Sequence, residues 1–236
     1  LCVTVDPTDA RDFDDAVGAR RLSGGGHEVS VHIADVTHYV APDTPIDNEA
    51  KRRTCSAYLV DRVIPMLPER LCNDVCSLRP GEDRLAMSVI IHLDARGNVK
   101  DARMATSAIR SAARLDYDTV DALLEGRVAP DGLPCAPERA EEIADLLATL
   151  DEVRALRERI RRERGAIDFE TVEAKVLLDE GGTPTGVSVR RRTRATGLIE
   201  EAMLLANECV AKRLADAEAP AAYRVHERPI PEDLRA

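Results

Sequence analysis

The sequence predicts a mixed α+β fold, in which strands and helices occur in blocks instead of alternating regularly. Residues 85–93 alternate apolar and polar side chains with the period of a strand, and a turn-forming DARGN segment follows at residues 94–98. Two long segments of helical character, 138–164 and 196–216, lie further along the chain. Because strands follow strands and helices follow helices, we expect an α+β architecture and not repeated βαβ units.

The remaining elements follow from local signals along the chain. Pro45 directly after Thr44 is typical of a helix start, since proline suits the first helical position. No repeat and no long linker divides the chain, so we expect one domain over residues 1–236. Strands are predicted at residues 3–5, 16–22, 29–33, 99–109, 172–178 and 186–192, and further helices at residues 44–57 and 119–125.

The composition fits a soluble globular protein. The 236 residues are 44% hydrophobic and 32% charged, and no apolar run approaches the ~20 residues that span a membrane. No secretory signal is visible, and the six cysteines form no CxxC pair, so we expect buried, reduced thiols in a cytoplasmic protein and no zinc site. The chain starts without methionine and enters a strand at once, which predicts a piece of a longer protein.

The charge is acidic overall but basic in two places. A net charge of -10 argues against nucleic-acid binding by bulk electrostatics. Residues 157–164 (RERIRRER) are typical of a solvated helix face with ion pairs one turn apart. Residues 190–194 (RRRTR) follow a predicted strand, and both a surface role and phosphate contact stay open for them.

Five of the ten residues from 6 to 15 are aspartate, in the stretch DPTDARDFDDA. Carboxylates this close repel one another, and a cation relieves that repulsion. Hard oxygen ligands suit Mg²⁺ or Mn²⁺, and Mg²⁺ shares its shell with substrate phosphates, which indicates phosphoryl chemistry. An EF-hand is excluded, because its glycine and glutamate positions hold Arg11 and Val17. An aspartate-rich turn explains only one or two of the five residues.

Six collinear blocks, starting with this aspartate stretch, resemble the RNB domain of the ribonuclease II / ribonuclease R exoribonucleases. The RGAIDFE segment makes the ribonuclease R branch the closer match. The other blocks are VHIADVTHYV (31–40), VIPMLPERLCNDVCSLRPGEDRLAMSV (63–89), RGAIDFETVEAK (164–175), LIEEAMLLAN (198–207) and YRVHERP (223–229).

The resemblance implies a fold, a reaction and a set of site residues. The fold would be an RNB-type catalytic domain with a twisted, largely antiparallel sheet flanked by helices. The reaction would be Mg²⁺-dependent 3′-to-5′ hydrolysis of single-stranded RNA to nucleoside 5′-monophosphates, with two ions ~4 Å apart and Mn²⁺ as an alternative. Tyr58 and Phe169 would hold the 3′ end of the RNA, and Glu200 would contact the terminal sugar. The metal and the scissile phosphate would be bound by Asp6, Asp12, Asp14 and Asp15.

Each of these roles has a simpler alternative. Tyr58 and Phe169 are two of only six aromatic residues, and an aromatic side chain packs in a core more often than it stacks on a base. Glu200 falls at the border of an apolar helical stripe, as a pocket residue would, whereas its neighbour Glu201 is predicted to face solvent.

The resemblance also predicts limits on this chain. The family's later SPIRRY-type segment, whose arginine neutralises transition-state charge, and its flanking RNA-binding domains are absent from the sequence. We therefore expect residues 1–236 to be an incomplete RNB domain, monomeric, and weakly active or inactive alone. A non-catalytic RNB-like scaffold and a phosphoesterase acting on a small substrate stay open as alternatives.

Overall fold

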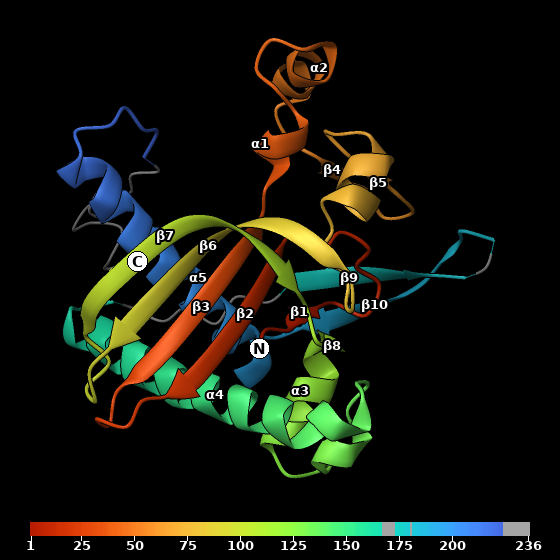
Figure 1. Cartoon of the computed structure of the whole chain (residues 1–236). Coiled ribbons are helices and arrows are strands. Elements are labelled where there is room, and N and C mark those ends of the chain that lie inside the picture. The colour runs from red at the N-terminus through yellow and green to blue at the C-terminus, as the bar shows by residue number, and fades with distance from the viewer. Residues whose placement is uncertain (167–172, 180, 224–236) are drawn as a thin grey trace, which may run out of the picture.

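The computed structural model describes residues 1–166, 173–179 and 181–223, and it confirms the α+β fold (Figure 1). Its centre is a four-stranded, wholly antiparallel sheet with the strand order β2-β3-β6-β7. The strands are β2 (Asp15–Arg21), β3 (His27–Ala34), β6 (Asp83–Leu93) and β7 (Val99–Arg110). The predicted strands at residues 16–22, 85–93 and 99–109 match three of them closely, because alternating side chains mark a sheet with one buried face.

Two long helices, α4 (Ala140–Glu163) and α5 (Arg194–Asp216), cover the buried face of this sheet, and the shorter helix α3 (Tyr117–Leu124) packs against both of them. Val29 and Val31 are fully buried against this layer, while the alternate residues Glu28 and Ser30 turn to the other face. The helices contribute the leucines of the same core, among them Leu147, Leu150, Leu198 and Leu205. Burial of these apolar side chains is the main force that fixes the helices on the sheet.

A separate pair of short strands joins the segment before β2 to the segment after β7. β1 (Thr4–Asp6) pairs in parallel with β8 (Arg114–Asp116), and Val3 bridges Val17 of β2. Asp6 therefore ends one strand next to the place where Asp15 begins another. A smaller apolar core supports this region and contains Cys2, Ala16, Ala34, Cys76, Leu78 and Ala86.

Residues 36–75 form a projection above the sheet that the sequence predicted only in part (Figure 1). The expected helix at 44–57 is shorter, because Thr54 takes a positive φ of 64° and ends it. The residues that follow form the two-residue strands of a hairpin. The elements of the projection are α1 (Val36–Tyr39), α2 (Pro45–Arg53), β4 (Ala57–Tyr58), β5 (Val63–Ile64) and the π-helical turn η1 (Leu71–Val75).

The remaining elements lie at the ends of the long helices. Two 3₁₀ turns, Pro130–Gly132 and Pro137–Arg139, lead into α4. The hairpin of β9 (Glu173–Leu178) and β10 (Pro184–Arg190) extends away from the sheet (Figure 1). In the part of the chain that the structure describes, no helix is both long and apolar enough to cross a membrane. All six cysteines are free thiols.

Candidate active site around the aspartate loop

The loop between β1 and β2 carries the aspartates and is held by the rest of the fold. We call residues 6–15 the aspartate loop. Its far end is tied to the segment after η1, because the Phe13 amide donates to Ser77 Oγ at 3.0 Å and the Leu78 amide donates to the Phe13 carbonyl at 2.8 Å. The Ala34 amide of β3 donates to the Asp14 carbonyl at 2.9 Å. These contacts with two separate segments fix the backbone that carries the carboxylates.

The carboxylates of this loop repel one another and are partly withdrawn from water. Burial, the charge of Asp15 and other nearby aspartates raise the pKa of Asp6 to about 7, against the opposing effect of Arg114. Burial and the charge of Asp14 raise the pKa of Asp15 to about 6. The pKa of Asp14 is also raised, first by burial and then by the charge of Asp12. The structure thus brings together the four aspartates predicted from the sequence, which we call the site aspartates.

The carboxylate groups of the site aspartates are of the type that binds a hard divalent cation, but their side chains are not arranged around a common point. Asp6 Oδ2 is buried and has no hydrogen-bond partner, which is costly unless a cation or donor satisfies it. Carboxylate oxygens are the ligands that Mg²⁺ and Mn²⁺ prefer. Among the described residues, however, no three His, Cys, Asp or Glu side chains are arranged to hold a metal ion.

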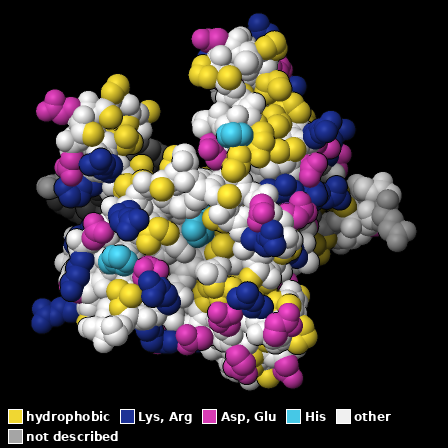
Figure 2. All heavy atoms as spheres, in the orientation of Figure 1, with side chains coloured by type: hydrophobic (Ala, Val, Ile, Leu, Met, Phe, Trp, Pro, Cys, Tyr) yellow, Lys and Arg dark blue, Asp and Glu magenta, His cyan; other side chains and the backbone are white. Residues whose placement is uncertain are grey.

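Tyr58 lies beside the site aspartates on the β4–β5 hairpin and is not a core residue. Its side chain is 70% exposed, so the core-packing alternative is wrong for it. Burial of its hydroxyl and the charge of Asp12 raise its pKa, and a hydrogen bond with Asp12 contributes to that shift. Other apolar side chains of the hairpin are also exposed, and hydrophobic side chains gather over this projection in Figure 2. An exposed aromatic ring next to a carboxylate cluster is a platform on which a base can stack.

Phe169, the second predicted aromatic residue, lies outside the described residues. The described chain resumes at β9, and from that strand Lys175 reaches the aspartate loop. Its Nζ lies 2.6 Å from Asp9 Oδ2 in an exposed ion pair. The β9–β10 hairpin is therefore connected to the loop through the one aspartate that is not a predicted ligand.

Glu200 lies on α5, as predicted, and is held by an arginine from the basic RRRTR segment. Arg192 Nε donates to Glu200 Oε2 at 2.7 Å, and Arg192 Nη2 lies 3.1 Å from Glu158 Oε1 of α4. Arg194 of the same segment donates to Asp151 and to the Leu124 carbonyl. These two arginines of the basic segment thus bind protein groups.

The prediction that Glu201 faces solvent is wrong. Its side chain is almost fully buried, and its Oε1 lies 2.7 Å from Arg161 Nη2 of α4. The solvated-face prediction for residues 157–164 also fails at Arg157, which is 8% exposed and pairs with Glu208. Both errors have one cause, because α4 and α5 pack through ion pairs as well as apolar side chains, and apolar periodicity does not detect such pairs.

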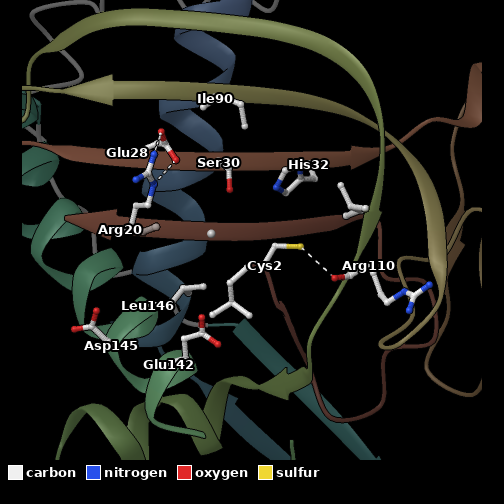
Figure 3. Close-up of a pocket in the computed structure, with 14 residues that line it drawn as sticks. Cys2, Arg20, Glu28, Ser30, His32, Ile90, Arg110, Glu142, Asp145 and Leu146 are labelled. Atoms are coloured by element: carbon white, nitrogen blue, oxygen red, sulfur yellow. Dashed lines mark hydrogen bonds and ion pairs between the residues drawn. The ribbon is translucent and has the colours of Figure 1, made fainter. Parts of the chain in front are cut away.

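A cavity of about 540 Å³ lies apart from this site, on the face of the sheet that α5 does not cover (Figure 3). Its charged lining residues are paired, as in the bidentate bond from Arg20 to Glu28 at 2.7 Å. His32 Nδ1 lies 2.5 Å from Ser88 Oγ, and burial lowers the pKa of this histidine to about 4. None of the site aspartates lines the cavity.

Comparisons with known proteins place the chain in a family of nucleases. The RNB domain model matches residues 1–236, and the chain therefore belongs to the RNB domain family. Ribonuclease R of Thermotoga maritima is 44% identical over 235 residues, which cover 99% of this chain and 32% of that protein. Ribonuclease R 1 of Lactococcus lactis is 43% identical over 237 residues, which cover 100% of this chain and 28% of that protein.

A solved structure extends the similarity to three dimensions. Mycoplasma genitalium RNase R in complex with ribose methylated single-stranded RNA superposes with a TM-score of 0.91 at 35% identity, over 99% of this chain and 35% of that one. The family resemblance seen in the sequence is thus confirmed. The chain spans about a third of the length of these relatives.

Proposed function

We propose that this chain is the metal-binding part of a 3′-to-5′ exoribonuclease that acts on single-stranded RNA. Membership of the RNB domain family and the names of its relatives support this reaction class. The observation that carries the proposal is the position of Tyr58, whose exposed ring lies next to Asp12 and the other site aspartates. A stacking platform beside a carboxylate cluster suits a single-stranded nucleic acid better than a small phosphoester.

In this proposal the reaction is hydrolysis of the last phosphodiester bond. Water oxygen attacks the phosphorus, the bond to the 3′ oxygen breaks, and a nucleoside 5′-monophosphate leaves a strand with a new 3′ hydroxyl. Mg²⁺, as two ions or with Mn²⁺ in its place, supplies charge that activates the water and stabilises the leaving oxygen. The residues that would hold it are Asp6, Asp12, Asp14 and Asp15.

The protein side chains divide the remaining work. Asp6 and Asp15 stand at the ends of paired strands, so their backbone positions are fixed before substrate binds. Tyr58 would stack on a base near the 3′ end, and Phe169 would hold that end as a second aromatic residue. Glu200, oriented by Arg192, would accept a hydrogen bond from a ribose hydroxyl and so favour RNA over DNA.

The test uses 5′-labelled single-stranded RNA, Mg²⁺ and the complete gene product. We expect stepwise shortening from the 3′ end, which Asp14→Asn abolishes. Asp9→Asn is the matched control, because Asp9 belongs to the same loop but pairs with Lys175. This control should retain activity. Equal loss in both variants would show that loop charge in general, and not the site aspartates, matters.

Two alternatives are outcomes of the same assay. Binding of RNA without shortening would favour a non-catalytic RNB-like scaffold. Hydrolysis of a small phosphodiester with no effect of Tyr58→Ala would favour a phosphoesterase.

We also propose a monomeric, cytoplasmic protein, in keeping with its six free thiols. Light scattering after gel filtration tests the first of these points, and cell fractionation tests the second.

A further inference from the structure

Arg114 contacts the aspartate loop from a strand more than 95 residues away in sequence. It is the first residue of β8 and pairs with Thr4 of β1, two residues before Asp6. From there its Nη2 donates to the carbonyls of Pro7 and Thr8, both at 2.8 Å. These two carbonyls belong to the start of the loop, so Arg114 holds the backbone directly after Asp6.

The same guanidinium also reaches the far half of the loop. Its central carbon lies 5.6 Å from the centroid of the Phe13 ring, within the range of a cation–π contact. Phe13 stands between Asp12 and Asp14 in sequence. One side chain therefore contacts both halves of the loop, once between Asp6 and Asp12 and once between Asp12 and Asp14.

The bonding of Arg114 is unusual for a partly buried arginine. Among the described residues it forms no ion pair with a carboxylate, and its Nε is buried without a hydrogen-bond partner. Two carbonyls and one ring are the contacts that orient it. A planar guanidinium makes such contacts together, whereas the compact ammonium of lysine does not.

We propose that Arg114 is a positioning residue that sets the shape of the aspartate loop and, through it, the affinity of the site aspartates for a divalent cation. Outer residues that orient metal ligands commonly change metal affinity by about 10- to 100-fold when removed. The proposal extends the proposed function, but its two main readouts, metal binding and loop exchange, do not depend on RNA hydrolysis.

The experiment compares Arg114→Met and Arg114→Lys with Arg110→Met in the complete gene product. Arg110 is the matched control, because it lies four residues earlier and pairs with exposed Asp83. Mn²⁺ binding is followed by electron paramagnetic resonance. Amide exchange of residues 8–14 is measured without metal. We expect Arg114→Met to weaken Mn²⁺ binding about 10- to 100-fold and to speed loop exchange, with Arg114→Lys intermediate and Arg110→Met unchanged.

A fourth variant, at Phe13, shows whether any loss of Mn²⁺ binding comes from simple misfolding. Phe13→Leu removes the ring but leaves both carbonyl bonds of Arg114, so it should weaken Mn²⁺ binding less than Arg114→Met does. Mn²⁺ affinity and loop exchange equal to the control in both Arg114→Lys and Phe13→Leu would overturn the proposal. If the wild type binds Mn²⁺ in the expected pattern but never shortens RNA, the proposed function fails and the positioning role stands.

Discussion

Two regions of this molecule are rich in carboxylates, and they differ in whether those carboxylates are paired with arginine. At the interface of α4 and α5, Asp151 lies close to Arg154 and Arg194, and Glu158 lies close to Arg154 and Arg192. In the aspartate loop, none of the site aspartates forms an ion pair with an arginine or lysine among the described residues.

The difference appears directly in the pKa values. Burial raises the pKa of Asp151, but hydrogen bonds from Arg194 and Arg154 outweigh it and leave the pKa lowered. Burial and the charge of Asp15 raise the pKa of Asp6 to about 7, although the charge of Arg114 opposes the shift. Paired carboxylates join two helices, whereas unpaired carboxylates cost stability and persist where a ligand needs them.

The largest expected effect separates stability from activity in the loop. Asp6→Asn removes the charge next to three other aspartates and supplies a donor, so the metal-free protein should melt at about 2–4 °C higher temperature. RNA shortening should fall on the order of 10³-fold, because a metal ligand is lost. Thermal melting in EDTA and single-turnover kinetics measure the two effects. A lower melting temperature with activity retained would show that the charge of Asp6 stabilises the fold and is not needed for activity.

The corresponding change in the helix interface should act in the other direction. Glu158→Ala leaves Arg154 and Arg192 without a shared partner at a site where the glutamate side chain is 10% exposed. We expect a loss of about 3 kcal/mol in the free energy of unfolding, measured by urea titration. The control is Glu163→Ala on the same helix, an exposed residue 3.9 Å from Arg159, which should change stability by less than about 0.5 kcal/mol. Equal effects of the two changes would remove the distinction.

The pH dependence of stability tests the loop itself. Because the folded-state pKa of Asp6 is about 7 and that of Asp15 about 6, the folded protein binds protons that the unfolded chain, with ordinary values of 3.8, has released. Metal-free stability contributed by these groups is therefore present near pH 4 and is lost as pH rises toward 7. The melting advantage of Asp6→Asn over wild type should grow across this window, and added Mg²⁺ should reverse it. An advantage independent of pH would contradict the shift.

The sequence predicted the sheet and the acidic site because both leave local patterns. Alternation along residues 85–93 marks a strand, and five aspartates within ten residues mark an acidic loop. The β4–β5 hairpin was missed, because strands of two residues show no period. The three-residue strand β8 was missed as well. Arg114 was missed because its contacts with the aspartate loop join residues far apart in sequence. The role of Phe169 stays a prediction.

The smallest expected effect concerns Glu201. It belongs to the helix interface, but its pKa is raised like those of Asp6 and Asp15. Burial raises its pKa despite the opposing charge of Arg161. Its Oε1 lies 2.7 Å from Arg161 Nη2 but has no hydrogen-bond partner. Glu201→Gln keeps an acceptor near Arg161 and removes the desolvation cost of a buried charge. We therefore expect a change within about 1 kcal/mol in urea titration at pH 7. A loss as large as that of Glu158→Ala would instead show that the charge of Glu201 stabilises the helix interface, as the charge of Glu158 does. The aspartate loop would then be the region whose acidic side chains lower stability.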